Sequence, residues 1–314
     1  MSDLYDAAHT AVHQCLDLWE DESIAIVTDD ERRVIAEALY EVACDVTDDA
    51  TFVQYQPGDQ HGQEPPAPVA AAMKEADTFL APTTRSLSHT RARSAACEAG
   101  ARGATLPGIT EEVMIAGLDA DYEAIAEHSA NVSEQVAHAD EIRVTAPAGT
   151  EITFETGGRE WHEDTGIIHD PGSFSNLPAG EVFVAPESAE GTFVVDGTMM
   201  PHGLLDDDQT LTFEVEDGHV THISDEAVRT DVEEASVEAG RAATNIAELG
   251  IGTNVGVEEL VGSVLLDEKA AGTVHIAIGD NAAIGGDVEA PIHLDGIIRE
   301  PTVYADGEPV ALPR

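Results

Sequence analysis

The sequence of 314 residues is long enough for one large domain or two ordinary ones, and its hydrophobic fraction of 42% supplies a core. It holds 62 acidic and 14 basic residues, a net charge of −48, and the acidic residues recur in almost every block of ten. This even distribution is typical of a folded protein with a carboxylate-covered surface, as in salt-adapted proteins, and unlike a disordered acidic tail. The charge disfavours partners such as nucleic acid and anionic membranes.

Three features predict a cytoplasmic protein. The cysteines, Cys15, Cys44 and Cys97, are widely spaced and form no CxxC motif, so we expect small core residues in a reducing compartment. The start MSDLYDAAHT is polar, unlike a signal peptide. No apolar run approaches the roughly 18 residues that a membrane-spanning helix needs.

The first half alternates helical and strand patterns. Residues 4–19 have helical spacing of apolar positions. Strands are expected at 23–27, 51–55, 78–81 and 104–106, and helices at 33–46, 69–74, 88–99 and from 110 toward 138. This alternation predicts an α/β N-terminal domain, a parallel sheet with flanking helices, over residues 1–139.

The pattern changes near residue 140 to short segments of period two. Strands are expected at 141–145, 151–155, 182–185, 191–195, 211–215, 219–223, 273–278, 291–294 and 302–304, with one helix at 225–246. Asp217-Gly218 between two of these segments is a hairpin signal. We therefore predict an α+β C-terminal domain, rich in antiparallel strands, over residues 140–314.

The stretch from Asp267 to Asp295 carries the strongest chemical signal. His293 and Asp295 are spaced i and i+2, so both point to one face of a strand. The alternating segment around His275 predicts a neighbouring strand with that imidazole on one face. An imidazole and a carboxylate side by side can hold a divalent cation.

Further sequence segments resemble those of a known family. They are APTTRSLSHTRAR and ATLPGIT in the first half, and NLPAGEVFVAP, ELGIGTN, DEKAAGTVHIAIGDN and HLDGII in the second. As a set, they resemble the M29 metallopeptidases, the thermophilic aminopeptidase T family. The resemblance implies a cytoplasmic metallo-aminopeptidase with a peptide substrate, two divalent ions (Zn, Co or Mn) and a homodimer.

The resemblance also implies roles for individual residues. The metal ligands would be Glu181, Glu248, Glu268, His275, His293 and Asp295. Glu268 or Glu248 would act as general base toward a metal-activated water. Lys269 would stabilise the oxyanion, or form an ion pair with Glu268, and we favour the ion pair.

Two alternatives remain open. The M29 peptidases carry a tyrosine soon after the equivalent of His275, where this chain has residues 279–282, GDNA. A related branch, the 2,5-dihydroxypyridine ring-opening dioxygenases, resembles this chain in its His-x-Asp pair and holds a single iron; two histidines and a carboxylate form the facial triad of non-haem iron oxygenases. A catalytically silent metal-binding protein is the other alternative. His162 is expected in a loop, with a pocket beside the metal site as the second interpretation.

The segment from Arg85 to Arg93 concentrates positive charge in an acidic chain. It holds Arg85, His89, Arg91 and Arg93 and follows a predicted strand. Ligands of α/β folds bind at the carboxyl edge of the sheet, so these residues are candidates for substrate contact. A structural arginine network or a subunit contact is an equal alternative.

Overall fold

The structure is a computed structural model that describes residues 2–314. The chain forms two compact units, the first of residues up to 126 together with 164–179, and the second of residues 127–163 together with 180–314. The domain boundary at residue 139 stays a prediction, because compact units need not coincide with independently folding domains.

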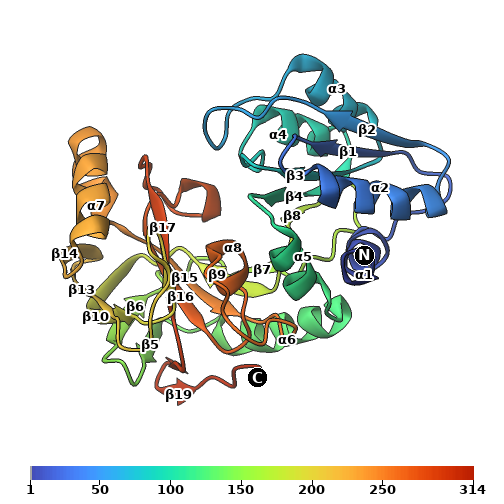
Figure 1. Ribbon diagram of the computed structural model, residues 1–314. Helices are drawn as coiled ribbons and strands as arrows, with labels where there is room; N and C mark the ends of the chain where they lie inside the picture. The colour runs from blue at the N-terminus through green and yellow to red at the C-terminus, as the bar shows by residue number, and fades with distance from the viewer. Residues whose placement is uncertain (1) are drawn as a thin grey trace. The chain divides into compact units, whose positions relative to one another are not determined.

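The first unit is a parallel sheet with helices on both faces, as predicted. Its strands are β1 (Ile24–Thr28), β2 (Ala50–Gln54), β3 (Thr78–Thr83), β4 (Arg102–Pro107) and β8 (Phe174–Asn176), in the spatial order β2-β1-β3-β4-β8. Its helices are α1 (Ser2–His9), continued by a π-helical stretch Thr10–Cys15, then α2 (Arg33–Val46), α3 (Ala67–Glu75), α4 (Arg91–Glu98) and α5 (Glu111–Leu118). Helices α1 and α2 cover one face of the sheet, and α3 and α4 the other (Figure 1).

Two details of this unit differ from the predictions. The single long helix expected from residue 110 is two helices, α5 and α6 (Tyr122–Val136). The chain breaks between them because the Asp121 carboxylate accepts the amides of Glu123 and Ala124, which starts a new helix. The fifth strand, β8, comes from a segment for which no strand was predicted, since three residues are too few for a periodic signal.

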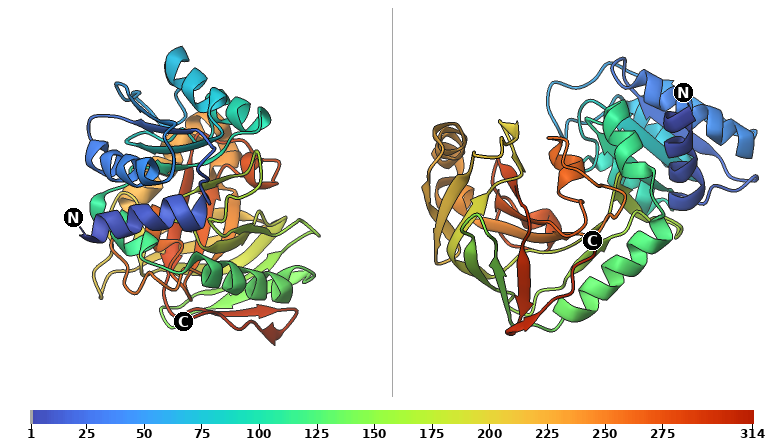
Figure 2. Two further views of the ribbon diagram at one scale, coloured as in Figure 1. Left: turned by 90° about the vertical axis from the view of Figure 1, so that its right-hand side faces the viewer. Right: turned by 60° about the horizontal axis from the view of Figure 1, so that its bottom comes forward.

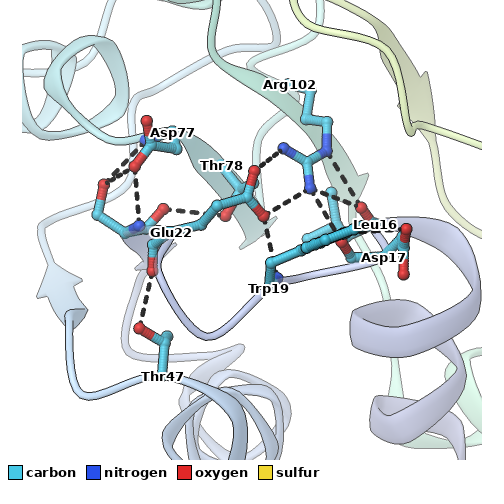
Figure 3. Close-up of polar contacts among 9 residues, drawn as sticks. Leu16, Asp17, Trp19, Glu22, Thr47, Asp77, Thr78 and Arg102 are labelled. Carbon is cyan, nitrogen blue, oxygen red and sulfur yellow. Dashed lines mark hydrogen bonds and ion pairs between the residues drawn. The ribbon is translucent and has the colours of Figure 1, made fainter.

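A buried arginine ties the N-terminal helix to the sheet of the first unit (Figure 3). Arg102 on β4 donates to both carboxylate oxygens of Glu22, at 2.5 and 2.8 Å, and to the carbonyls of Leu16 and Asp17. The Arg102 side chain is 7% exposed. All three guanidinium nitrogens therefore have partners inside the unit.

The second unit contains two antiparallel sheets. Sheet I has the order β14-β13-β10-β6-β5-β18-β19, with β5 (Glu141–Thr145), β6 (Glu151–Glu155), β10 (Ser188–Val195), β13 (Leu211–Glu216), β14 (His219–Ile223), β18 (Thr302–Ala305) and β19 (Glu308–Pro309). Sheet II has the order β12-β11-β17-β16-β15-β9-β7, with β7 (His162–Asp164), β9 (Glu181–Val184), β11 (Thr198–Met199), β12 (Gly203–Leu204), β15 (Ile246–Gly252), β16 (Val274–Gly279) and β17 (His293–Ile298). This confirms the predicted antiparallel character.

Helices complete the second unit. Helix α7 (Glu226–Ala239) begins at the cap residue Asp225 and packs beside β14, as Figure 2 also shows; the short α8 is Val264–Asp267. The helix predicted to reach residue 246 ends earlier, at Gly240, which adopts a positive φ of 60°. Within residues 2–314, no helix is both long and apolar enough to cross a membrane. Cys44 is exposed, so the prediction of three core cysteines is wrong; only Cys15 is buried.

The core of the second unit lies between its two sheets and uses alternate residues of each strand. From sheet I come Phe154, Phe193 and Phe213, the last two with stacked rings 4.5 Å apart. From sheet II come Val182, Val184, Leu249, Ile251, Val274, Ile276, Ile278 and Ile298. Because side chains alternate between faces, the remaining residues of these strands point away from this core.

Candidate metal centre

Four neighbouring strands of sheet II present acidic and imidazole side chains on the face opposite the core. Glu181 lies on β9, Glu248 on β15, His275 on β16, and His293 and Asp295 on β17. Strand pairing sets these residues beside one another: Ala277 is opposite Asp295 and Gly279 is opposite His293, while β15 pairs with both β16 and β9. Residues 67 or more positions apart in the chain, such as Glu181 and Glu248, thus converge on one surface.

Glu248 lies in β15, a segment for which no strand was predicted. The glycines of ELGIGTN hide the strand pattern in the sequence, and one of them makes room for a neighbouring side chain. A Cβ on Gly250 would lie 2.0 Å from Nε2 of His275, so the imidazole occupies the space that a side chain at position 250 would fill. Glycine usually weakens a strand, and here it marks the place where a ligand-type side chain lies directly over the backbone.

The convergent side chains form two groups that could each hold a metal ion. One is Glu181, Glu248 and His275, and the other is Glu248, His293 and Asp295; within each group the ligand atoms all lie within 4.8 Å of one another. Glu248 belongs to both groups. Five of the six predicted ligands are therefore brought together, around a shared carboxylate.

The nitrogen–oxygen distances inside the groups are at the long end of the range for hydrogen bonds. Nε2 of His275 lies 3.3 Å from Glu248 Oε1 and 3.4 Å from Glu181 Oε2. Nε2 of His293 lies 3.4 Å from Glu248 Oε2 and 3.5 Å from Asp295 Oδ1. Both imidazoles thus direct Nε2 toward carboxylate oxygens, the orientation in which that nitrogen and those oxygens can share a cation.

The sixth predicted ligand, Glu268, is bound to a lysine. Lys269, whose side chain is 4% exposed, contacts Glu268 at 2.8 Å and also forms a short contact with Glu181. The favoured ion pair of Lys269 is therefore present. Glu268 falls outside both metal groups, and its role as ligand or base stays a prediction.

Burial and mutual charge shift the acid–base behaviour of the cluster. Burial, reinforced by Glu268 and Glu248, raises the pKa of Glu181 to about 8, against the opposing charge of Lys269. Burial alone would lower the pKa of His275, but its bond to Glu248 and the surrounding carboxylates raise it to about 9. Burial would likewise raise the pKa of Glu248, yet contacts with both imidazoles hold it well below its usual range. The cluster has more acidic than basic groups, which favours a bound cation.

Two side-chain atoms bear on whether a metal fits. Glu181 Oε2 accepts no hydrogen bond within residues 2–314 although Glu181 is only 6% exposed. A buried carboxylate oxygen without a donor is costly, and a cation bound by the cluster would reduce that cost. Nδ1 of His293 lies 2.7 Å from the carbonyl oxygen of Asp280, the backbone support that fixes a metal-ligating imidazole. The residues present thus fit a divalent cation.

The remaining candidate residues from the sequence lie outside the two metal groups. In the first unit, Arg91 pairs with Glu64 at 3.2 Å, and Arg93 donates to the Ser88 carbonyl and lies over the Phe174 ring. These contacts favour the structural interpretation of both arginines, while the roles of Arg85 and His89 stay predictions. His162 lies on β7, and its ring contacts Phe183 of β9, 5.3 Å between centroids. Phe183 was missed, although its i+2 spacing from Glu181 placed it on the same face.

Comparison with known proteins decides between the families. The family model NicX, 2,5-dihydroxypyridine 5,6-dioxygenase, matches residues 3–312. The chain belongs to the NicX family. A 2,5-dihydroxypyridine 5,6-dioxygenase from Pseudomonas putida is 26% identical over 186 residues, 54% of this chain, and the match spans about half (52%) of that relative's length.

Solved structures share the NicX-family fold. The 2,5-dihydroxypyridine dioxygenase from Pseudomonas putida KT2440 superposes with a TM-score of 0.78 at 20% identity, covering 98% of this chain and 95% of that one. AmpT from Thermus thermophilus superposes with a TM-score of 0.68 at 19% identity, covering 99% of each chain. At these identities the likeness shows the fold alone.

The assignment to the M29 metallopeptidases is therefore wrong, and so are the aminopeptidase activity, the hydrolase class and the related descriptors. The family match over residues 3–312 overturns them. The error has a structural context: AmpT shares the fold of this chain, and a shared fold does not fix the function. The findings support the alternative, a dioxygenase.

Proposed function

We propose that this chain is a metal-dependent ring-cleaving dioxygenase that acts on a hydroxylated pyridine. The observation that carries the proposal is the NicX-family match over residues 3–312, on a chain whose second unit gathers Glu248, His293 and Asp295 within metal-binding distance. The named activity of the Pseudomonas putida relative, on 2,5-dihydroxypyridine, supplies the substrate class.

The proposed cofactor is one ferrous ion held by Glu248, His293 and Asp295. When bound, Fe(II) would mediate electron transfer from the ring to dioxygen, whose triplet ground state reacts slowly with a closed-shell molecule, and the ring itself would be the net reductant. The protein's part is to hold the donors: Asp280 fixes the His293 ring through its carbonyl, and Glu248 is buried. The group has one imidazole and two carboxylates, where the facial triad has two imidazoles and one carboxylate, so Mn²⁺ is the competing metal.

The number of ions is part of the same proposal. The second group, Glu181, Glu248 and His275, already contains a cationic neighbour, because Lys269 contacts Glu181. A resident ammonium beside this group favours one divalent ion per chain over two. Elemental analysis of protein purified in high salt decides it: one ion per chain supports the proposal, and two identical ions contradict the mononuclear site.

Oxygen uptake tests the activity. Metal-free protein is loaded with Fe(II), Mn(II), Co(II) or Zn(II) in high salt and given 2,5-dihydroxypyridine. We expect one O₂ consumed per ring with Fe(II), loss of uptake with a chelator, and loss in His293→Ala. His222→Ala, an exposed histidine on β14, is the matched control and should retain uptake. No oxygen uptake by fully loaded protein would contradict the function. We also propose that the chain forms a homodimer. Analytical sedimentation in high salt measures the mass of the particle and so the number of chains in it.

A further inference from the structure

An aromatic pair borders the candidate metal centre on sheet II. Phe183 lies two residues after Glu181 on β9, so both side chains project from the face that carries the metal groups. The imidazole of His162 on the edge strand β7 lies against the phenyl ring, with centroids 5.3 Å apart and planes inclined by 33°. Both residues are half-buried, so part of each ring reaches solvent.

Strand pairing places this aromatic pair next to His275, a member of one of the two metal groups. Gly250 is opposite Phe183 on one side and opposite His275 on the other. The His275 ring fills the space over Gly250, as its 2.0 Å approach to a Cβ built there shows. No side chain of β15 therefore stands between the phenyl ring and the imidazole, and the surface of Phe183 continues into the metal groups.

The loop between β16 and β17 limits the same surface on another side. It leads directly into His293, and it is tied to the segment before β7 by an ion pair of 3.2 Å between Asp287 and Arg159. Gly285 of this loop comes so near that a Cβ on it would lie 3.4 Å from Nε2 of His162. The aromatic pair thus lies between the loop and the metal groups.

His162 has hydrogen-bonding capacity that the protein does not use. Within residues 2–314, its ring nitrogens take part in no hydrogen bond or ion pair. A half-buried imidazole on the metal-bearing face, with a stacking partner and two unused nitrogens, is suited to hold a planar ligand that also carries hydroxyl groups.

We propose that Phe183 and His162 are positioning residues for the substrate ring. The planar heteroaromatic ring stacks on this aromatic pair, and the imidazole forms a hydrogen bond with a ring hydroxyl, so that the ring lies beside the metal ligands. This inference rests on the proposed function for the substrate class, a hydroxylated pyridine, and on sheet II alone for the binding surface.

Anaerobic binding separates this inference from the activity itself. The dissociation constant of 2,5-dihydroxypyridine is measured by calorimetry on Fe(II)-loaded protein in high salt under argon. Phe183→Leu removes the stacking surface at similar volume, and a loss of one aromatic contact should weaken binding about three- to tenfold. The KM in oxygen uptake should rise by the same factor, with kcat within about twofold of wild type and unchanged iron content.

Two further variants refine the test. His162→Phe keeps the stacking and removes the hydrogen bond, so it should weaken binding less than His162→Leu, which removes both. Phe52→Leu is the matched control, because Phe52 is also half-buried and contacts the Tyr40 ring, in the first unit. It should leave the dissociation constant unchanged.

The outcomes distinguish the two proposals. If 2,5-dihydroxypyridine binds, Phe183→Leu weakens the binding and no oxygen is consumed, the ring-binding surface stands and the dioxygenase activity falls. If oxygen uptake is normal and Phe183→Leu and His162→Leu match wild type in both binding and KM, the aromatic pair is not the ring site. Absence of binding by the wild type also overturns it.

Discussion

Each unit of the molecule contains a buried cationic side chain that contacts carboxylate, and the two sites differ in how completely their polar atoms are hydrogen-bonded. In the first unit, Arg102 meets one carboxylate, Glu22, and two backbone carbonyls, and every guanidinium nitrogen has a partner (Figure 3). In the second unit, Lys269 meets two carboxylates, Glu181 and Glu268, and one oxygen of Glu181 remains without a donor.

This difference separates a structural ion pair from a site. A buried pair with balanced charge and saturated hydrogen bonds has no capacity for a further ligand. The cluster in the second unit contains four carboxylates, one ammonium and two imidazoles. Its charge is therefore balanced only when it also holds a proton or a divalent cation. Local charge balance thus locates a metal centre in a chain whose whole surface is acidic.

The largest expected effect is the loss of stability when the buried cation of each unit, Arg102 or Lys269, is removed. Lys269→Met leaves the buried Glu181 and Glu268 uncompensated, so the metal-free variant should lose about 3–5 kcal/mol of unfolding free energy. Arg102→Met leaves only the partly exposed Glu22 without its cation and should lose less. Denaturant unfolding in high salt measures it. Adding Mn²⁺ should stabilise Lys269→Met by more than it stabilises Arg102→Met or the wild type, since only in Lys269→Met can a cation also take the place of the ammonium beside Glu181. Equal rescue of both variants would contradict the comparison.

The next effect concerns the carboxylate that the two metal groups share. Glu248→Gln keeps the shape of the side chain and removes its charge, so metal affinity and oxygen uptake should both fall by about 100-fold or more. Titration with Fe(II) under argon gives the affinity. The matched control is Glu22→Gln, which removes a carboxylate paired with a buried cation in the first unit and should leave the affinity unchanged. Retained affinity in Glu248→Gln would show that the groups are not metal sites.

The smallest effect is the response of the first unit to acid. The hydrogen bond from Arg102 lowers the pKa of Glu22 below its ordinary value of 4.5. The stability from this pair is therefore fully present above pH 4.5 and is lost as the pH falls through the lowered pKa. We expect on the order of 1 kcal/mol, the size of a partly exposed pair. Thermal unfolding between pH 5.5 and 3 should show a weaker pH dependence in Glu22→Gln, and an identical slope would refute the assignment.

Periodicity predicted most of the fold, because amphipathic helices and alternating strands leave a local signal. Helix 33–46, strands 141–145, 151–155 and 219–223, and the pair His293 and Asp295 on one face are as expected. Features that depend on distant residues could not be read locally. The glycine-rich segment around Gly250 is a strand because it pairs with β9 and β16, and Gly250 has no side chain where the His275 ring lies. Likewise, β8 is a strand because it pairs with the edge of β4.

The site shows the same division. His-x-Asp spacing indicated a metal centre, but the identity of the chemistry depends on which donors meet, and Glu181 and Glu248 meet only through the pairing of β9, β15 and β16. The sequence segments that suggested the peptidases did not separate them from the NicX family, and solved structures of both kinds share the fold of this chain. The position of Phe183 on the same face as Glu181 could be predicted from their spacing, whereas its contact with His162 could be predicted only from the order of the strands in the sheet.

The late arrival of β8 has a consequence for biosynthesis. This strand pairs in parallel with β4, yet residues 127–163 of the other unit are translated between the two. A nascent chain that has emerged only as far as residue 139 therefore exposes the backbone of Gly103, Ala104 and Thr105 as an unpaired rim. We expect such fragments to self-associate on the ribosome or after truncation, so chaperone capture should end only once Asn176 has left the exit tunnel.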